Sequence, residues 1–262
     1  MIAFMIMLTI CVLHLFLKLF VDTYMTQAKL KVQHYYIRNS EVPFEEDMFH
    51  EFKGHRNLAV EELPPWTQET STEKASRRAV SRTLNAMLNT GKGGTVFLGI
   101  VDSGYVRGLP MTSYQKDHLI GSLDDLMSRY KPPVQKHRYK ITFVPVLDME
   151  CTEDERIKQY SCEDTERMKP HIFRSHRYCW CDKDVVAKFN CGILTQDYVI
   201  EIKIMPWNSN DPRNQDSGCG SLIKLHPLHE DEEGSVYFRR QASLVKVHVK
   251  RYIVIIRSFN IV

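Results

Sequence analysis

The chain has 262 residues, of which 43% are hydrophobic and 26% are charged, and this excludes a disordered or low-complexity protein because enough apolar side chain is present to close a core. Lys and Arg exceed Asp and Glu by 35 to 32, so the net charge alone does not indicate a nucleic-acid-binding protein. Seven cysteines at irregular spacing argue against a disulfide framework and indicate reduced thiols, as in the cytosol or another reducing compartment.

The first apolar run predicts a membrane anchor over residues 1–21. Residues 1–17 contain no charged side chain, and the run resumes after Lys18, which is just long enough for a spanning helix of about 20 residues. A cleaved signal peptide is one alternative, but the basic start and the small-residue cleavage site are missing. A buried core helix is the other. The basic residues follow the segment, so the positive-inside rule predicts that the rest of the chain faces the cytosol, with the mitochondrial outer membrane and the endoplasmic reticulum both open as the site.

Beyond the anchor, residues 22–42 are polar and predict a linker, and a globular pattern begins at Pro43. Helical spacing of apolar residues predicts helices at 72–89, with Thr72 as N-cap, and at 113–129. Strand-like runs occur at 51–53, 95–101, 140–147, 198–204, 235–239 and 244–256. Residues 207–234 are acidic in part and predict an exposed loop. This mixture predicts one α+β domain over 43–256.

A glycine-rich segment, residues 91–94, joins the first helix to the following strand. A phosphate-binding loop needs the opposite order, in which a strand precedes the glycines and a helix follows them. We therefore expect these glycines to end the helix and turn the chain back tightly.

Three acidic residues form the candidate catalytic group. Glu51 lies in a short strand, Asp102 follows the buried strand directly, and Glu46 precedes Glu51 by five residues, so Glu46 and Glu51 converge only if a turn intervenes. Convergent carboxylates bind Mg²⁺ or Mn²⁺, and such an ion activates water at a phosphate. Lys53 would add a positive charge for that phosphate. Surface charge at strand ends is the simpler alternative, because the chain has 32 acidic residues.

These residues lie within a pattern that resembles the AlbA-type domain of the schlafen family. The matching pieces are the Glu46–Lys53 run, the helix and strand over 84–104, Gly108 and the later segment 236–240. The resemblance is good over 45–108 and thin elsewhere. It implies an AlbA-type lobe, with a mixed sheet and two or more packed helices, after the predicted transmembrane helix.

The resemblance also implies an activity, because family members that are endoribonucleases use two glutamates and an aspartate at these places. Glu46, Glu51 and Asp102 would then be the catalytic carboxylates and the ligands of Mg²⁺ or Mn²⁺. The chain departs from the family where Leu88 replaces a small residue and where Val101 replaces a frequent second aspartate.

The family's structural zinc site matches poorly. His176, Cys179 and Cys181 form a partial cluster, but Met205-Pro206-Trp207 stands where an adjacent cysteine pair is expected. Buried cysteines that act as small apolar side chains explain the pair more simply than zinc.

Basic residues recur near the carboxylates and suit the phosphates of an RNA strand. The candidate contacts are Lys53, Arg77, Arg78, Arg82 and Lys92, with Arg239-Arg240 as a further basic cluster. An ordinary solvated surface is the alternative for each one.

Schlafen ribonuclease cores resemble two related lobes around structured RNA, and about 210 residues here match one. The resemblance therefore implies a metal-dependent RNA endonuclease subunit that works with a second copy or another schlafen-like chain. Similar nematode proteins trim small-RNA precursors in a membrane-associated complex. The alternative is a non-catalytic scaffold that tethers a catalytic partner to a membrane and adds RNA-binding surface. A DNA-binding regulator is disfavoured by the anchor.

Overall fold

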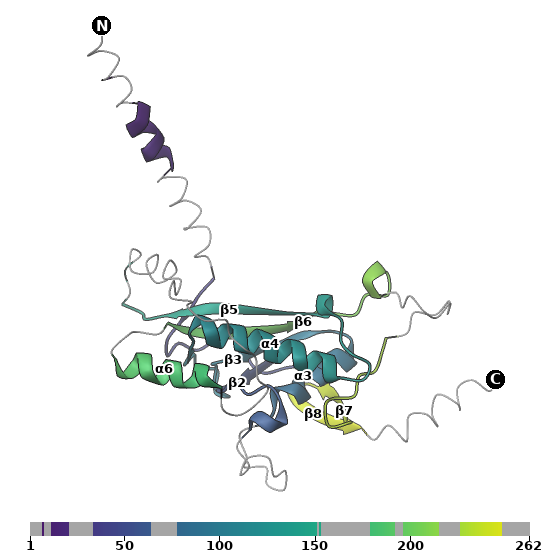
Figure 1. The fold of residues 1–262 in the computed structure, drawn as a ribbon. Coiled ribbons are helices and arrows are strands. Elements are labelled where there is room, and N and C mark those ends of the chain that lie inside the picture. The colour runs from purple at the N-terminus through teal and green to yellow at the C-terminus, as the bar shows by residue number, and fades with distance from the viewer. Residues whose placement is uncertain are drawn as a thin grey trace, which may run out of the picture.

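The computed structural model describes residues 7, 12–20, 34–63, 78–150, 152, 179–191, 196–214 and 226–247. Within these ranges a six-stranded sheet carries helices on one face, and a two-stranded hairpin lies beside it (Figure 1). The strands are β1 (Tyr36–Ile37), β2 (His50–Lys53), β3 (Gly94–Leu98), β4 (Leu109–Pro110), β5 (Tyr139–Leu147), β6 (Asp197–Ile204), β7 (Val236–Arg240) and β8 (Ser243–Val247). The helices are α3 (Val80–Thr90), α4 (Ser113–Arg129) and α6 (Trp180–Asn190), with short 3-10 turns at Val60–Glu62, Lys136–Arg138 and Pro212–Asn214.

The sheet mixes parallel and antiparallel pairs, so the α+β prediction is confirmed. Its order is β1-β5-β6-β3-β2, and β4 pairs with β6. Strands β2 and β3 are parallel, with Glu51 opposite Val96 and Lys53 opposite Leu98. A parallel pair needs a crossover connection, and α3 lies in that connection. The carboxyl ends of β2 and β3 therefore meet at one edge of the sheet.

Helices α3 and α4 cover one face of this sheet. Leu84 and Met87 of α3 and Leu123 of α4 pack with Val96 and Leu98 in the main core. Helix α4 matches the predicted span 113–129, and a capping box between Thr112 and Gln115 fixes its start. Residues 72–77 of the other predicted helix lie outside the described residues, and the described helix begins at Val80.

The glycine segment does end α3, as predicted. Gly91 is left-handed, with φ 75°, and its N–H donates to the Leu88 carbonyl, a conformation that glycine adopts at little cost. Gly93 has φ 73°, and a Cβ there would lie 2.4 Å from the carbonyl oxygen of Ile204. The chain therefore returns to the sheet through a passage that is too tight for a side chain.

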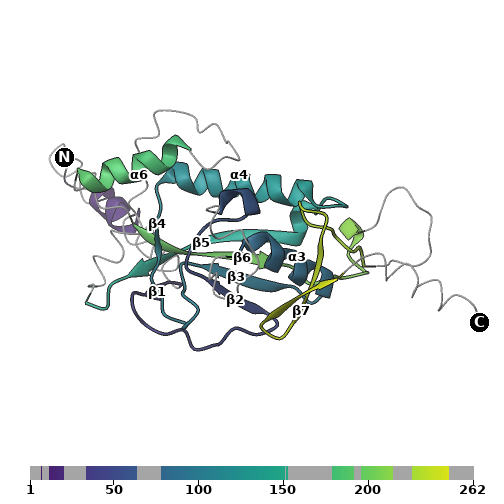
Figure 2. The same cartoon turned by 90° about the horizontal axis from the view of Figure 1, so that it is seen from below.

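The segment before β2 covers the opposite face (Figure 2). Phe44 packs its ring against Phe52 and Phe97, with centroids 5.8 Å and 5.2 Å apart. The described part of the predicted linker, residues 34–42, also belongs to the fold, because β1 pairs with the end of β5. A strand of two residues is too short to show any periodicity, so the prediction of a linker up to residue 42 was wrong there. Residues 22–33 lie outside the described residues.

The hairpin β7–β8 packs beside α3, and the segment that leads into it is buried. His229 is 3% exposed and Asp231 is 1% exposed, so the prediction of an exposed loop through residue 234 was wrong in this part. Acidic composition suggested exposure to solvent, but one oxygen of the buried Asp231 is satisfied locally: Oδ1 accepts from the N–H groups of Glu233 and Ser235. Residues 215–225 and 248–262 lie outside the described residues.

Helix α6 and the N-terminal segment differ most from the predictions. Helix α6 was not predicted, because its polar side chains interrupt any sustained apolar spacing. Residues 12–20 are helical, and Phe16 and Phe20 are among their exposed side chains. Among the residues described, no helix is both long and apolar enough to cross a membrane. The predicted transmembrane helix over 1–21 therefore has no support in the structure, and residues 1–6, 8–11 and 21 lie outside the described part.

Candidate functional site

Glu51 lies on the helix-covered face of β2 and is almost fully buried. Its side chain points to the same face as Lys53, since Phe52 between them points to the other. The Lys53 ammonium lies 2.5 Å from Glu51 Oε1 and donates to the Phe52 carbonyl at 2.9 Å. The Thr83 hydroxyl of α3 donates to the same carboxylate oxygen at 3.4 Å. Lys53, predicted to contact RNA, is thus held as a counter-ion of Glu51.

Arg239 of β7 supplies a second cation to Glu51. Its Nη1 lies 2.5 Å from Glu51 Oε2, and its side chain is 0% exposed. Nε donates to the Asp47 carbonyl at 2.6 Å, and Nη2 donates to the His50 carbonyl at 2.8 Å. Arg239 therefore ties the hairpin to β2 and fixes Glu51.

Sequence reasoning assigned Arg239 to an exposed basic cluster. The usable signal was the alternation along β7, which places Arg239 on the same face as the buried Tyr237 and leaves Arg240 exposed. A buried arginine needs a partner charge, and Glu51 provides it.

Glu46 reaches the same region as Glu51 because a turn lies between them in the chain. Such a turn was the condition expected for the two side chains to converge. Asp47 Oδ1 accepts from the N–H groups of Phe49 and His50, at 2.7 and 2.8 Å, and this local turn folds the chain back. Glu46 Oε1 then accepts from the Phe52 N–H at 2.8 Å.

The charge environment of Glu46 links the three predicted carboxylates. Partial burial raises the pKa of Glu46, the N–H of Phe52 lowers it, and the negative charges of Glu51 and Asp102 raise it again. Like charges that raise a carboxyl pKa lie close enough to repel one another. The structure thus brings Glu46, Glu51 and Asp102 to one region.

Asp102 occupies the turn that follows β3. The Val101 N–H donates to the Tyr105 carbonyl, and the Gly104 N–H donates back to the Val101 carbonyl. Gly104 has φ 81°, and the turn leaves Asp102 exposed. Asp102 therefore lies at the edge of the sheet where β2 and β3 end, directly after the buried strand, as the sequence indicated.

The three carboxylates fit a hard divalent cation by donor type. Oxygen ligands suit Mg²⁺ and Mn²⁺, and such an ion would offset the negative charges of Glu51 and Asp102, which add to the effect of burial in raising the pKa of Glu46. The ligand atoms of these three carboxylates do not form a compact group. Within the described ranges, the one set of metal-binding side chains whose ligand atoms all lie within 4.8 Å of one another consists of other residues. Both oxygens of Glu51 are also neutralised by protein cations, which leaves Glu46 and Asp102 as the more available ligands.

Two asparagines of α3 bind the backbone of the segments that lie next to this site. Asn89 Nδ2 donates to the carbonyls of His229 and Tyr237 at 2.9 and 3.1 Å, and its Oδ1 accepts from the His229 N–H at 2.7 Å. Asn85 Oδ1 accepts from the Tyr237 N–H at 2.9 Å. Both side chains are buried. We call Asn85 and Asn89 the asparagine clamp, because they hold the backbone that carries Arg239.

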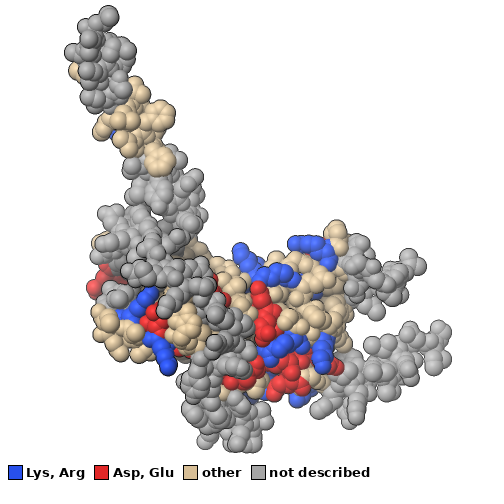
Figure 3. Space-filling view, in the orientation of Figure 1, with Lys and Arg blue, Asp and Glu red and all other residues tan. Residues whose placement is uncertain are grey.

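Of the remaining predicted RNA contacts, some are exposed and one is held in an ion pair. Arg78 and Lys92 are exposed. Arg82 instead pairs with Glu233 at 3.0 Å and is 15% exposed, and Arg77 lies outside the described residues. On the face seen in Figure 3, basic and acidic side chains are interspersed. Arg78 and Lys92 are therefore the candidates available to a phosphate backbone.

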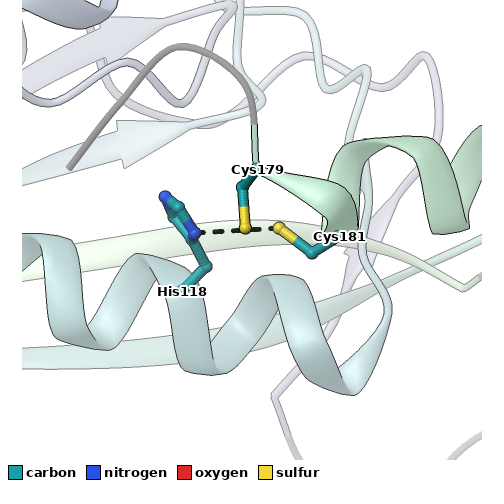
Figure 4. A group of neighbouring side chains, drawn as sticks. All are labelled: His118, Cys179 and Cys181. Carbon is teal, nitrogen blue, oxygen red and sulfur yellow. Dashed lines mark hydrogen bonds between the residues drawn. The ribbon is translucent and has the colours of Figure 1, made fainter. Parts of the chain in front are cut away.

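The predicted zinc ligands are only partly placed. Cys179 and Cys181 lie at the start of α6 and are 4% and 0% exposed, while His176 lies outside the described residues. Their partner is His118 of α4, which sequence reasoning missed because it is distant in the chain; its Nδ1 lies 3.7 Å from Cys181 Sγ (Figure 4). Burial raises the pKa of the Cys181 thiol. At the position where the family's cysteine pair is expected, the Arg138 guanidinium lies over the Trp207 ring, 4.8 Å from its centroid.

Comparison with known protein families agrees with this arrangement. Residues 46–248 match the family described as Schlafen, AlbA_2, a range that begins at Glu46 and includes β2 to β8. The match covers more than half of the chain. The chain therefore belongs to the schlafen family of AlbA_2 type, whose domains are of a nucleic-acid-binding or nuclease kind.

Proposed function

We propose that the chain is a metal-dependent endoribonuclease subunit that cleaves RNA at the edge of the sheet formed by the ends of β2 and β3. The observation that carries the proposal is the placement of the three carboxylates: Glu51 lies in β2, Glu46 accepts from the Phe52 N–H of the same strand, and Asp102 follows the parallel strand β3. Burial raises the pKa of Glu46, the negative charges of Glu51 and Asp102 add to this increase, and carboxyl groups perturbed in this way gather at functional sites.

Each side chain then has a role. Glu46 and Asp102 would hold Mg²⁺ or Mn²⁺ together with Glu51, and the bound ion would supply an activated water and stabilise charge on the phosphate. Lys53 and Arg239 hold the Glu51 carboxylate in place. Arg78 and Lys92 would contact the RNA backbone, and a second schlafen-like chain, identical or different, would complete the surface around the RNA.

The test is RNA cleavage by the purified full chain with Mn²⁺, alone and with schlafen-like partners that co-purify with it. Glu46→Gln and Asp102→Asn should each lower the cleavage rate by roughly 100-fold or more, by loss of an ion ligand. The matched control is Asp125→Asn, because Asp125 is a half-exposed acid on α4 that pairs with Arg129, and it should retain the activity. Equal rates for all these variants would refute catalysis by this chain.

A second candidate function is a non-catalytic scaffold that binds RNA and a catalytic partner. It is favoured by Glu51, whose two oxygens each lie 2.5 Å from a protein cation, as expected of a structural ion pair. In that case cleavage by the assembled complex depends on the partner's carboxylates and is insensitive to Asp102→Asn. RNA binding would still weaken with Lys92→Ala.

We extend the proposal to membrane attachment through residues 1–21, with the folded domain on the cytosolic side. Its support is the exposed apolar surface of residues 12–20, in which Phe16 is 72% and Phe20 is 73% exposed, a pattern that lipid or another apolar partner would cover. Flotation of the full chain with phosphatidylcholine vesicles tests it. Phe16→Glu should abolish flotation, whereas Val186→Glu on the exposed side of α6 should not; equal flotation of both would contradict the attachment.

A further inference from the structure

A compact group of metal-binding side chains lies outside the carboxylate site. We call His118, Cys179 and Cys181 the thiol–histidine cluster. It joins the N-terminal half of α4 to the first turn of α6, and both ribbon views show α6 next to the N-terminal end of α4 (Figures 1 and 2). The three side chains point toward one another (Figure 4).

The spacing within the cluster is that of a coordination shell. The three ligand atoms lie within 4.8 Å of one another, and Cys181 Sγ is 3.7 Å from His118 Nδ1. With Zn–S about 2.3 Å and Zn–N about 2.0–2.1 Å, a tetrahedral site separates sulfur and nitrogen by about 3.6 Å. An ion could therefore enter between these atoms with little movement of the backbone.

The surroundings favour a soft cation over the hard one proposed for the carboxylates. Cys179 and Cys181 form a small apolar cluster with Tyr114, and the ring of Tyr114 lies 4.5 Å from that of Trp180 in an edge-on contact. Thiolate and imidazole in a dry site select zinc over Mg²⁺ or Mn²⁺.

The carboxylate next to Cys181 in the chain is engaged by other side chains. Asp182 Oδ1 pairs with Arg56 and accepts from Gln115 Nε2 at 3.0 Å. The bond to Gln115 also links the first turn of α6 to α4. The protein ligands of an ion would thus be the two sulfurs and the imidazole, with water in the fourth tetrahedral position.

We propose that the thiol–histidine cluster binds one Zn²⁺ ion, which fastens α6 to α4. Packed cysteines alone would need no imidazole nitrogen directed at their sulfurs, and this nitrogen distinguishes a metal site from an apolar contact. Two described contacts, Gln115 with Asp182 and His118 with Cys181, join the first turn of α6 to α4, so the ion would strengthen the attachment of the helix.

Metal analysis of the purified full chain tests the proposal. We expect one zinc per chain by elemental mass spectrometry, and loss of most of it in Cys181→Ser and in His118→Ala. Cys191→Ser is the matched control, because Cys191 is an exposed free cysteine just beyond the same helix, and it should retain the zinc. Retention of zinc by all three variants would overturn the assignment to this cluster.

A measurement on the unmutated chain covers the case in which a variant does not fold. Co²⁺ added to the reduced, zinc-free chain should give thiolate-to-cobalt absorption in the near ultraviolet and tetrahedral bands in the visible, both abolished by added Zn²⁺. Zinc removal should also lower the midpoint of thermal unfolding. A chain that holds no zinc and gives no such bands would overturn the proposal, as would an intact mass that shows a Cys179–Cys181 disulfide in the freshly purified protein.

Discussion

The substitution Arg239→Ala tests the central contact of the site. It removes the cation 2.5 Å from Glu51 Oε2. It also leaves the carbonyls of Asp47 and His50 without the guanidinium that donates to them. All of these groups lie where water reaches poorly, since the Arg239 side chain is 0% exposed.

The size of the effect follows from the partners that remain. Removal of one member of a buried ion pair costs about 3–5 kcal/mol, because the other charge stays buried. Lys53 still lies 2.5 Å from the second oxygen of Glu51, which places the expected loss at the low end, about 3 kcal/mol. For a domain of this size that corresponds to a fall in the melting temperature of roughly 6–12 °C.

Urea unfolding followed by circular dichroism measures this loss, and the neighbouring Arg240→Ala is the matched control. Arg240 is exposed on the same strand, so its replacement should change the free energy of unfolding by less than about 0.5 kcal/mol. The double variant Arg239→Met with Glu51→Gln should recover part of the loss, because it removes both charges of this ion pair and leaves only Lys53, whose side chain is 11% exposed, without its counter-ion. Equal stability of Arg239→Ala and Arg240→Ala would refute the ion-pair reasoning.

Three further substitutions test other parts of the fold by the same unfolding measurement. Gly93→Ala should lower the free energy of unfolding by about 3 kcal/mol, because it combines left-handed strain with a clash against a backbone carbonyl. Gly234 has the same φ of 73° but open space around it, so Gly234→Ala should lower it by only about 1 kcal/mol. Similar losses in the two variants would contradict the clash. Asn89→Ala should lower the free energy of unfolding by about 3 kcal/mol, because it leaves buried backbone groups unpaired. Asn210→Ala, on an exposed turn, should change it little. An Asn89→Ala variant as stable as the unaltered chain would argue against the asparagine clamp. Burial raises the pKa of Asp231 above 3.8, so ionisation of this carboxyl disfavours the folded state. Asp231→Asn should therefore gain stability relative to the unaltered chain as the pH rises above about 4; a stability difference that does not change with pH would refute this.

Local patterns predicted much of the fold because they depend on neighbours in the sequence. The span of α4 followed from apolar spacing, and the end of α3 followed from the glycine at position 91. Strand β1 has only two residues, and α6 has no clear apolar stripe, so neither leaves a periodic signal. These elements depend on tertiary contacts that the sequence does not display locally.

The candidate site was predictable only in its acidic members. Glu46, Glu51 and Asp102 came from a family resemblance, and the parallel pairing of β2 with β3 explains why they lie in one region. The roles of Lys53 and Arg239 were not predictable, because composition presents both as surface cations and only the packed structure shows their burial. His118 was missed for the same reason, since it comes from a helix far from the two cysteines in the sequence.

The contact between Arg239 and β2 has a consequence for how the protein is made. The guanidinium bonds to carbonyls 189 and 192 positions earlier in the chain, so during synthesis β2 emerges from the ribosome long before its partner exists. Contacts of such long sequence separation form late in folding. Until then Glu51 has only Lys53 to neutralise it, and a chain cut short before residue 239 never acquires the second cation. The carboxylate site therefore reaches its final charge state last, and a truncated product would be recognisable by a domain that folds weakly and is readily degraded.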